Sequence, residues 1–233
     1  MRATNAISEM QDSISIILSG GFGSRMKEAY PGIPKSLVLL KGRPLIDYVI
    51  DTCLGVGVNQ VLVAGGYRFA QLESHVTKNH PSGRVSAIDT GEGTDIIDRL
   101  RQIVRVKSFR NVLITYGDSL VTLDKEVVNQ YLANNILSAG VYEKTVPYGV
   151  WQFSDVPDKP KFKLHQKTFK YWINSGYYTI PCKLLLELLD NYSDFEFGLT
   201  ELMNKTINSQ VHRVLDWSPY DSPADLKMSE LRG

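Results

Sequence analysis

Short runs of apolar and β-branched residues recur along the chain, and a glycine follows each of them. The clearest are Ile-Ser-Ile-Ile-Leu at 14–18, Val-Leu-Val-Ala at 61–64 and Val-Leu-Ile-Thr at 112–115. Such runs, with few polar interruptions, are typical of strands that are buried on both faces of a parallel sheet. The pattern therefore predicts three buried strands whose carboxyl ends open into glycine-containing turns.

A helical spacing of apolar residues separates these strands. Segments 45–54, 95–106 and 124–137 each carry apolar side chains three or four positions apart, which predicts helices with one buried face. Thr94 and Asp124 are the candidate N-caps of the second and third helices. Alternating strands and helices predict an α/β fold, with a Rossmann-like, doubly wound and mostly parallel sheet. Ligands of such sheets bind beyond the carboxyl ends of the strands.

The second half of the chain is less regular. Segment 148–168 contains two prolines and predicts strands and loops, whereas 171–180 predicts a strand that is broken at Gly176. The leucine-rich segment 182–189 predicts a buried helix. We expect a flexible N-terminal segment at 1–13 and a single domain at 14–233.

Composition narrows the class of protein. The 233 residues include 43% hydrophobic and 22% charged residues, and the net charge is +1. This balance is typical of a soluble globular domain, and it gives no basic surface for nucleic acid. No apolar run approaches the roughly 18 residues that a membrane span needs, and the polar N-terminus does not resemble a signal peptide. With two cysteines and no disulfide framework, we expect a cytoplasmic protein without nucleic-acid or membrane partners; a homo-oligomer is compatible with the sequence.

The first candidate site is the glycine loop Leu-Ser-Gly-Gly-Phe-Gly-Ser-Arg at 18–25. Glycines let the backbone N–H groups approach an anion, and Arg25 and Lys35 add positive charge that suits phosphate. A Walker A loop would need a glycine where Arg25 stands, and a dinucleotide fingerprint would need glycine or alanine in place of Met26. A turn with incidental glycines would leave both cations unexplained. The loop therefore indicates phosphate binding.

Two carboxylates are candidate metal ligands. Asp118 follows the strand at 112–115, and because Asp124 is the better placed helix cap, Asp118 is free to bind Mg²⁺. Mg²⁺ is commonly held by one or two carboxylates together with substrate phosphates, so a second acid is expected, and Asp221 is the candidate. On local grounds Asp221 is equally suited to cap a helix that begins near Pro223. The four histidines have no zinc-ligand spacing.

These motifs resemble the sugar-phosphate nucleotidyltransferases, and most narrowly the glucose-1-phosphate cytidylyltransferases. The loop and Lys35 are similar to the family signature G-G-x-G-[ST]-R…P-K, and Lys-Gly-Arg-Pro-Leu-Ile at 41–46 is similar to its helix entry. Further matches follow in family order: Ala-Gly-Gly-Tyr-Arg at 64–68, Asp-Thr-Gly at 89–91 with Arg99-Leu100, Thr-Tyr-Gly-Asp at 115–118, Ile-Asn-Ser-Gly-Tyr at 173–177 and Trp-Ser-Pro-Tyr-Asp-Ser at 217–222.

The resemblance implies a nucleotidyltransferase fold of the glycosyltransferase-A-like type and a role for each matching residue. CTP and a small phosphorylated substrate, such as a sugar-1-phosphate, would react with Mg²⁺ as cofactor, as in the nucleotide-sugar biosynthesis that supplies cell-surface polysaccharide. The implied catalytic residues are Arg25, Lys35 and Lys167, and the implied metal ligands are Asp118 and Asp221. The implied nucleotide-binding residues are Leu18, Ser19, Gly20, Gly21, Gly23, Ser24, Gly93 and Thr94, and the implied substrate-binding residues are Gly149, Gln166 and Asn174.

One departure from the family pattern concerns the substrate. Family members carry Glu-Lys-Pro where this chain has Gln-Lys-Thr at 166–168, so a neutral amide stands where a glutamate usually binds sugar hydroxyls. The acceptor is thus either a sugar-1-phosphate or another small phosphate. The nucleotide is either CTP or, as an alternative, dTTP or UTP. A catalytically silent nucleotide-binding homologue is a further alternative, and the missing third glycine argues against a Rossmann dehydrogenase.

Overall fold

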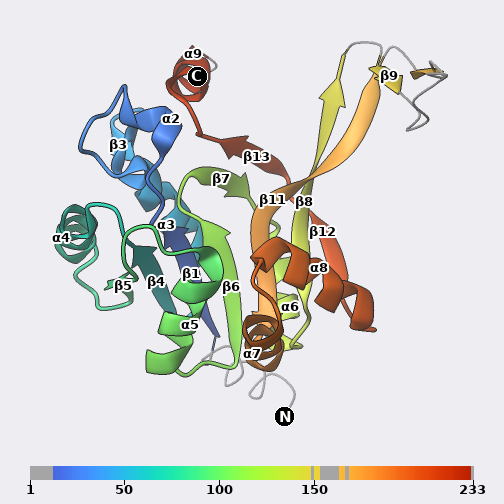
Figure 1. The fold of residues 1–233 in the computed structure, drawn as a ribbon, viewed down its shortest axis with the longest axis horizontal. Helices are drawn as coiled ribbons and strands as arrows, with labels where there is room; N and C mark the ends of the chain where they lie inside the picture. The colour runs from blue at the N-terminus through green and yellow to red at the C-terminus, as the bar shows by residue number, and fades with distance from the viewer. Residues whose placement is uncertain (1–12, 148–149, 153–162, 166–167, 232–233) are drawn as a thin grey trace.

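The computed structural model describes residues 13–147, 150–152, 163–165 and 168–231. A seven-stranded sheet with the order β12-β8-β11-β6-β1-β4-β5 forms its centre (Figure 1). Within this sheet β11 runs antiparallel to its neighbours and the other strands share one direction, so the predicted mostly parallel α/β sheet is confirmed. The strands are β1 (Ser13–Ser19), β4 (Gln60–Gly65), β5 (Val85–Asp89), β6 (Asn111–Tyr116), β8 (Ser138–Val146), β11 (Phe169–Pro181) and β12 (Gln210–Arg213).

Helices cover both faces of the sheet (Figure 1). Side chains alternate along β1, so that Ile16 packs into one hydrophobic cluster and Ile17 into the other. The first cluster includes α5 (Ile96–Val106), α7 (Cys182–Asn191) and α8 (Phe195–Lys205). The second includes α3 (Leu45–Gly55), α4 (Phe69–Asn79) and α6 (Lys125–Ala133). No helix in the described ranges is long and apolar enough to cross a membrane.

Three boundaries differ from the sequence predictions. Helix α5 is capped by Asp95, whose carboxylate accepts a hydrogen bond from the N–H of Asp98 at 2.8 Å, and not by Thr94. Helix α6 begins after the predicted cap, Asp124, but it stops at Ala133 because Asn135 has a φ of 55°, which a right-handed helix does not contain. Ser13 belongs to β1 rather than to the N-terminal segment, the rest of which lies outside the described residues.

The predicted break in the strand at 171–180 is present in β11. The register shifts between Asn174 and Tyr178, and Gly176 has a φ of 76°. A Cβ atom at Gly176 would lie 2.5 Å from the ring of Tyr116, so glycine is needed both for the backbone conformation and for the neighbouring side chain. In the predicted strand-and-loop segment, the described residues form β9 (Val150–Gln152) and β10 (Lys163–His165).

The order of the strands determines where the carboxyl ends of β1 and β6 meet. After β1 the chain adds β4 and β5 on one side and then β6 on the other, and ligands of such sheets bind at this reversal. The N–H of Tyr220 donates to the carbonyl of Asp118 at 2.9 Å, which brings the C-terminal part of the chain to the end of β6. The remaining elements are α2 (Ser24–Lys27), the 3-10 helix η1 (Lys35–Leu37), β2 (Leu39–Leu40), β3 (Arg43–Pro44), β7 (Ser119–Thr122), β13 (Asp216–Pro219) and α9 (Pro223–Leu231).

Candidate active site

A cavity of about 290 Å³ lies where the glycine loop leaves β1, beside the carboxyl end of β6. We call it the phosphate cavity. Except for Ser36 and Gly117, every residue that lines it is one that the sequence predicts as nucleotide-binding, catalytic or metal-binding. Its lining comprises Leu18, Ser19, Gly21, Gly23, Ser24, Arg25, Lys35, Ser36, Gly117, Asp118 and Asp221. The fold therefore gathers residues from three distant parts of the chain at the predicted edge of the sheet.

Two glycines of the loop are required by their surroundings. Gly23, just before α2, has a φ of 56°, and a Cβ there would lie 3.0 Å from the Cβ of Lys35. A Cβ at Gly20 would overlap the guanidinium group of Arg99. The loop can therefore lie close to both cationic side chains only because neither position carries a side chain of its own.

Arg99 holds the glycine loop in place through hydrogen bonds. Its side chain, in α5, donates hydrogen bonds to the carbonyls of Gly65 at 2.9 Å and Gly20 at 3.0 Å, and to the hydroxyl of Thr90. Burial lowers the pKa of Arg99, while the charges of Asp89 and Asp95 act in the opposite direction. Arg99 belongs to the motif match Asp-Thr-Gly at 89–91 with Arg99-Leu100, but the sequence predicted no role for it in the site.

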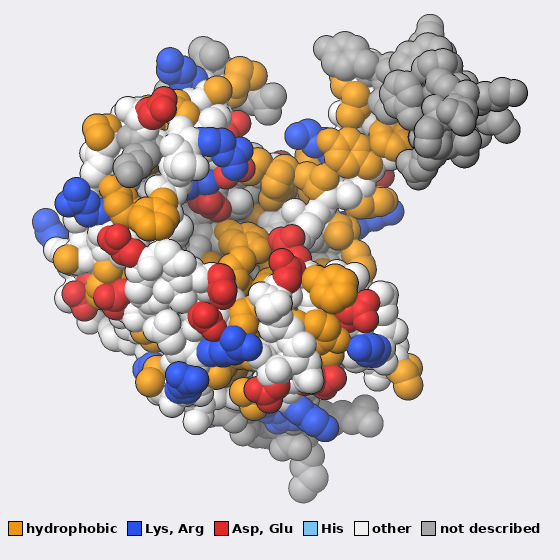
Figure 2. All heavy atoms as spheres, viewed as in Figure 1, with side chains coloured by type: hydrophobic (Ala, Val, Ile, Leu, Met, Phe, Trp, Pro, Cys, Tyr) orange, Lys and Arg blue, Asp and Glu red, His pale blue; other side chains and the backbone are white. Residues whose placement is uncertain are grey.

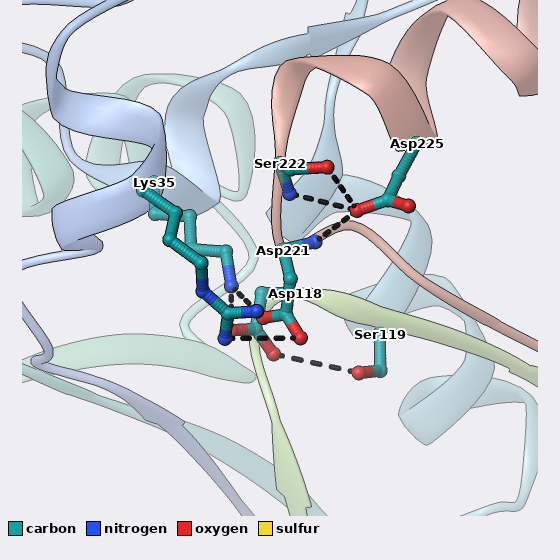
Figure 3. Close-up of polar contacts among 7 residues, drawn as sticks. Lys35, Asp118, Ser119, Asp221, Ser222 and Asp225 are labelled. Carbon is teal, nitrogen blue, oxygen red and sulfur yellow. Dashed lines mark hydrogen bonds and ion pairs between the residues drawn. The ribbon is translucent and has the colours of Figure 1, made fainter.

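Lys35 is the centre of an ion-pair cluster at the mouth of the loop. Its ammonium lies 2.6 Å from Oδ2 of Asp118 and 2.5 Å from Oδ1 of Asp221, and Figure 3 shows both carboxylates turned toward it. Arg25 lies on the other side, with 3.3 Å between its guanidinium and Oδ2 of Asp221. The side chain of Lys35 is 13% exposed and that of Arg25 is 70% exposed, so the first is fixed and the second can reach outward to a ligand.

The side chain of Asp221 makes ion pairs and does not cap α9. Asp225, in the first turn of α9, accepts hydrogen bonds from the N–H of Asp221 at 3.0 Å and of Ser222 at 2.7 Å (Figure 3). The Asp221 carboxylate faces Lys35 instead. Partial burial acts to raise the pKa of Asp221, but hydrogen bonds and charge from Lys35 and then Arg25 outweigh it, so the pKa lies below its usual value. Asp221 is therefore anionic at neutral pH.

Asp118 and Asp221 offer carboxylate oxygens that could hold Mg²⁺. Their oxygens converge on a single cation, the Lys35 ammonium, and carboxylate oxygens are the ligands that Mg²⁺ prefers. The described residues contain no group of three or more His, Cys, Asp or Glu side chains that could hold a metal by themselves. Two carboxylates open to a phosphate cavity are nevertheless the usual arrangement where substrate phosphates complete the metal's coordination.

A second cavity, of about 580 Å³, adjoins the phosphate cavity and shares Leu18, Gly21 and Asp118 with it. Gly20 and Thr94, both predicted to bind the nucleotide, line it. Gly93 has a φ of 72° and lies near Phe22, an exposed aromatic residue that contacts Tyr67 with 5.6 Å between ring centroids. Apart from Gly93, the predicted nucleotide-binding residues thus line two adjoining cavities.

Of the predicted substrate residues, the described part of the chain contains Asn174. Its amide donates to the hydroxyl of Tyr178 at 2.5 Å and to Oε1 of Glu196 at 3.3 Å, and Glu196 lines the second cavity. Gly149, Gln166 and Lys167 lie outside the described residues. Tyr116, Tyr178 and Glu196 belong to this polar group but were not identified from the sequence.

The fold is shared with nucleotidyltransferases of known structure. More particularly, the chain belongs to the family of MobA-like NTP transferase domains, whose sequence model matches residues 15–145. The resemblance to glucose-1-phosphate cytidylyltransferases and other sugar-phosphate nucleotidyltransferases is confirmed, at low sequence identity.

Similar proteins cover different shares of the chain. The bifunctional protein GlmU of Psychrobacter sp. (strain PRwf-1) is 26% identical over 206 residues, which make up 83% of this chain but 44% of that protein. The glucose-1-phosphate cytidylyltransferase of Salmonella typhi is 23% identical over 203 residues, with 76% of this chain and 78% of that protein covered. The structure of the inositol-1-phosphate CTP transferase from T. maritima aligns with a TM-score of 0.68 and 17% identity over 94% of each chain, which shows a shared fold.

Proposed function

We propose that this protein transfers a cytidylyl group from CTP to a small phosphorylated substrate, giving a CDP-linked product and pyrophosphate, with Mg²⁺ as cofactor. The observation that carries the proposal is the meeting of Lys35, Asp118 and Asp221 at the open end of a glycine loop. CTP is supported by the names of the relatives from Salmonella typhi and T. maritima, both of which use cytidine nucleotides.

The proposed reaction needs positive charge more than it needs a base. A phosphate oxygen of the acceptor attacks the α-phosphorus of CTP, a new P–O bond forms, and the bond to the β-phosphate breaks with its electron pair on pyrophosphate. The attacking oxygen is already an anion, so no proton has to be removed, and catalysis consists of positioning and charge stabilisation. Among the described residues no histidine lines the phosphate cavity, in accord with this requirement.

The residues of the phosphate cavity are suited to separate parts of the reaction. The backbone N–H groups from Gly20 to Ser24 would hold the triphosphate. Arg25, which is largely exposed, would bind the β- and γ-phosphates, and the fixed Lys35 would bind the α-phosphate where charge develops. Mg²⁺ held by Asp118 and Asp221 would neutralise further phosphate charge.

The test is pyrophosphate release in the presence of Mg²⁺, with CTP, UTP, dTTP, ATP and GTP each combined with sugar-1-phosphates and with phosphorylated alcohols and amines. We expect release with CTP and at least one acceptor. Turnover with UTP or dTTP in place of CTP would show that the nucleotide is wrong and the reaction class right. CTP binding measured by calorimetry, without release for any acceptor, would instead support a silent nucleotide-binding homologue.

A further inference from the structure

A carboxylate four residues further along the chain fixes the backbone of Asp221. Oδ2 of Asp225 accepts hydrogen bonds from the N–H of Asp221 at 3.0 Å, from the N–H of Ser222 at 2.7 Å and from the hydroxyl of Ser222 at 2.8 Å (Figure 3). The N–H of Asp225 donates in turn to the carbonyl of Ser222 at 3.1 Å. Because Ser222 directly precedes α9 and Asp225 is the third residue of that helix, the two form a capping box. This capping box reaches one residue further than the usual pair, to a candidate metal ligand.

The two candidate metal ligands are held in different ways. Asp118 lies in the short connection between β6 and β7, and its carbonyl accepts the N–H of Tyr220 at 2.9 Å. Asp221 lies between β13 and α9 and belongs to neither element. Its side chain is 41% exposed and pairs with Lys35. When a metal takes the place of the lysine, the direction of the Asp221 carboxylate therefore depends on the backbone that Asp225 holds.

Helix α9 is supported from one side. Leu226 is 2% exposed and packs in a hydrophobic cluster with Met26 and Tyr220, and the hydroxyls of Tyr220 and Ser229 lie 3.0 Å apart. On the other side, residues of α9 and β8 line a cavity of about 570 Å³. Figure 2 shows a hollow between the body of the molecule and the arm formed by β8 and β11, and α9 stands on the body's side of it. The start of α9, and Asp221 before it, are thus not braced by the arm.

We infer that Asp225 is a positioning residue of the metal site: its capping box turns the Asp221 carboxylate toward the cation that Asp221 shares with Asp118. Asp225 lines the cavity beside β8 and not the phosphate cavity, so it acts through Asp221. Because coupling between two equilibria is reciprocal, metal binding should also stabilise the first turn of α9. The inference rests on the proposed function, since it takes Mg²⁺ to bind at Asp118 and Asp221.

The experiment measures Mn²⁺ affinity without nucleotide, by electron paramagnetic resonance, for the wild type, Asp225→Ala and Asp225→Asn. Both variants lose the negative charge, but asparagine keeps an oxygen that can accept the two N–H groups and alanine does not. The matched control is Asp124→Ala, which removes the carboxylate that accepts the N–H groups of Glu126 and Val127 at the start of α6. Thermal unfolding verifies that each variant is folded. Hydrogen exchange of 221–226, with and without Mg²⁺, is the second readout.

We expect Asp225→Ala to weaken Mn²⁺ binding about 10- to 100-fold, the usual effect of removing a group that orients a metal ligand. Asp225→Asn should recover most of the lost affinity, and Asp124→Ala should bind Mn²⁺ as the wild type does. Mg²⁺ should slow hydrogen exchange of 221–226 in the wild type and not in Asp225→Ala. A role confined to the stability of α9 would lower the unfolding temperature without changing the affinity for Mn²⁺.

Equal Mn²⁺ affinity in the wild type and Asp225→Ala would overturn the inference and leave the metal site intact. Equal weakening in Asp225→Ala and Asp225→Asn would also overturn it, because the lost charge would then explain the effect without the hydrogen bonds. Exchange of 221–226 that Mg²⁺ does not slow would contradict the coupling to α9. A wild type that binds no Mn²⁺ would contradict the metal site of the proposed function, and the inference with it. Pyrophosphate release tests the transfer reaction independently, so the two failures are distinguishable.

Discussion

The ammonium of Lys35 lies 2.5 Å from Oδ1 of Asp221, although the two residues are 186 positions apart in the chain. The same ammonium lies 2.6 Å from Asp118, so without a ligand it occupies the oxygens that a metal ion would need. Lys35 and Mg²⁺ are thus expected to compete for these carboxylates. Metal binding would free the lysine for a phosphate.

This competition predicts that Lys35→Met binds metal more tightly than the wild type does. The gain in Mn²⁺ affinity without nucleotide should be about 5- to 10-fold, because removing one partly screened charge interaction is worth about 1 kcal/mol. Calorimetry or electron paramagnetic resonance of Mn²⁺ measures it. Lys183→Met, an exposed lysine on α7, is the control for loss of charge alone. An affinity equal to that of the wild type would show that Lys35 does not block the site.

The proposed roles of Lys35 and Asp118 predict a large loss of turnover when either is neutralised. Lys35→Ala and Asp118→Asn should each lower kcat by at least about 100-fold, as when one preorganised electrostatic group is removed from an active site. Steady-state pyrophosphate release measures the loss. A decrease of less than tenfold in either variant would remove that residue from the catalytic centre.

The contact between Gly20 and Arg99 predicts that Gly20→Ala destabilises the fold. The new methyl group would overlap the guanidinium of Arg99, which donates to two carbonyls and one hydroxyl. Overpacking of this kind costs about 1–3 kcal/mol. Urea unfolding measures the free energy of unfolding. Gly21→Ala is the matched control, because a Cβ there meets nothing within 4 Å. Equal stability of the two variants would mean that Arg99 moves aside freely.

His212 predicts a loss of stability in mild acid. The residue is 6% exposed, neither ring nitrogen has a hydrogen-bond partner among the described residues, and burial lowers its pKa from 6.5 to about 4. As the pH falls from 6.5 to 4, the unfolded chain binds a proton that the folded one does not. The free energy of unfolding should decrease over this range by up to about 3 kcal/mol.

The measurement for His212 is urea unfolding at several pH values, in the wild type and in His212→Phe. Phenylalanine keeps an aromatic ring against Tyr131, with which the histidine ring makes an edge contact, and it removes the titrating group. Between pH 6.5 and 4, the free energy of unfolding should depend less steeply on pH in His212→Phe than in the wild type. Equal slopes in the two proteins would attribute the acid sensitivity to other groups.

Local sequence patterns predicted the buried strands of the fold better than its surface helices. β1, β4 and β6 are apolar on both faces, so their runs stand out. Helix α4 has only Leu72 and Val76 buried among its residues, so its apolar stripe is narrow. Helix α8 buries Phe195, Leu199 and Leu202 at helical spacing, but it also contains Gly198, where a Cβ would lie 2.8 Å from Tyr192. Their positions depend on tertiary contacts that a local pattern does not contain.

The residues of the site likewise differ in how far the local sequence predicts them. The glycine loop and its two cations follow from local chemistry, but the pairing of Lys35 with Asp221 depends on how distant strands meet. On local grounds Asp221 was equally suited to cap a helix, but Asp225, in the first turn of α9, is the carboxylate that accepts the N–H bonds there. Arg99 belongs to an ordinary helical segment, and its role in holding the glycine loop follows from the carbonyl and hydroxyl groups around it.

In the proposed reaction, the cytidylyl group of CTP is transferred to a phosphate oxygen of the acceptor. Phosphorus NMR of the protein with CTP, Mg²⁺ and the acceptor selected by pyrophosphate release follows every phosphorus at once. Pyrophosphate and a new CDP-linked diphosphate should form in equal amounts, and Asp118→Asn should form neither at a comparable rate. Conversion of CTP to CDP and inorganic phosphate, or to CMP and pyrophosphate with the acceptor unchanged, would contradict the proposed reaction.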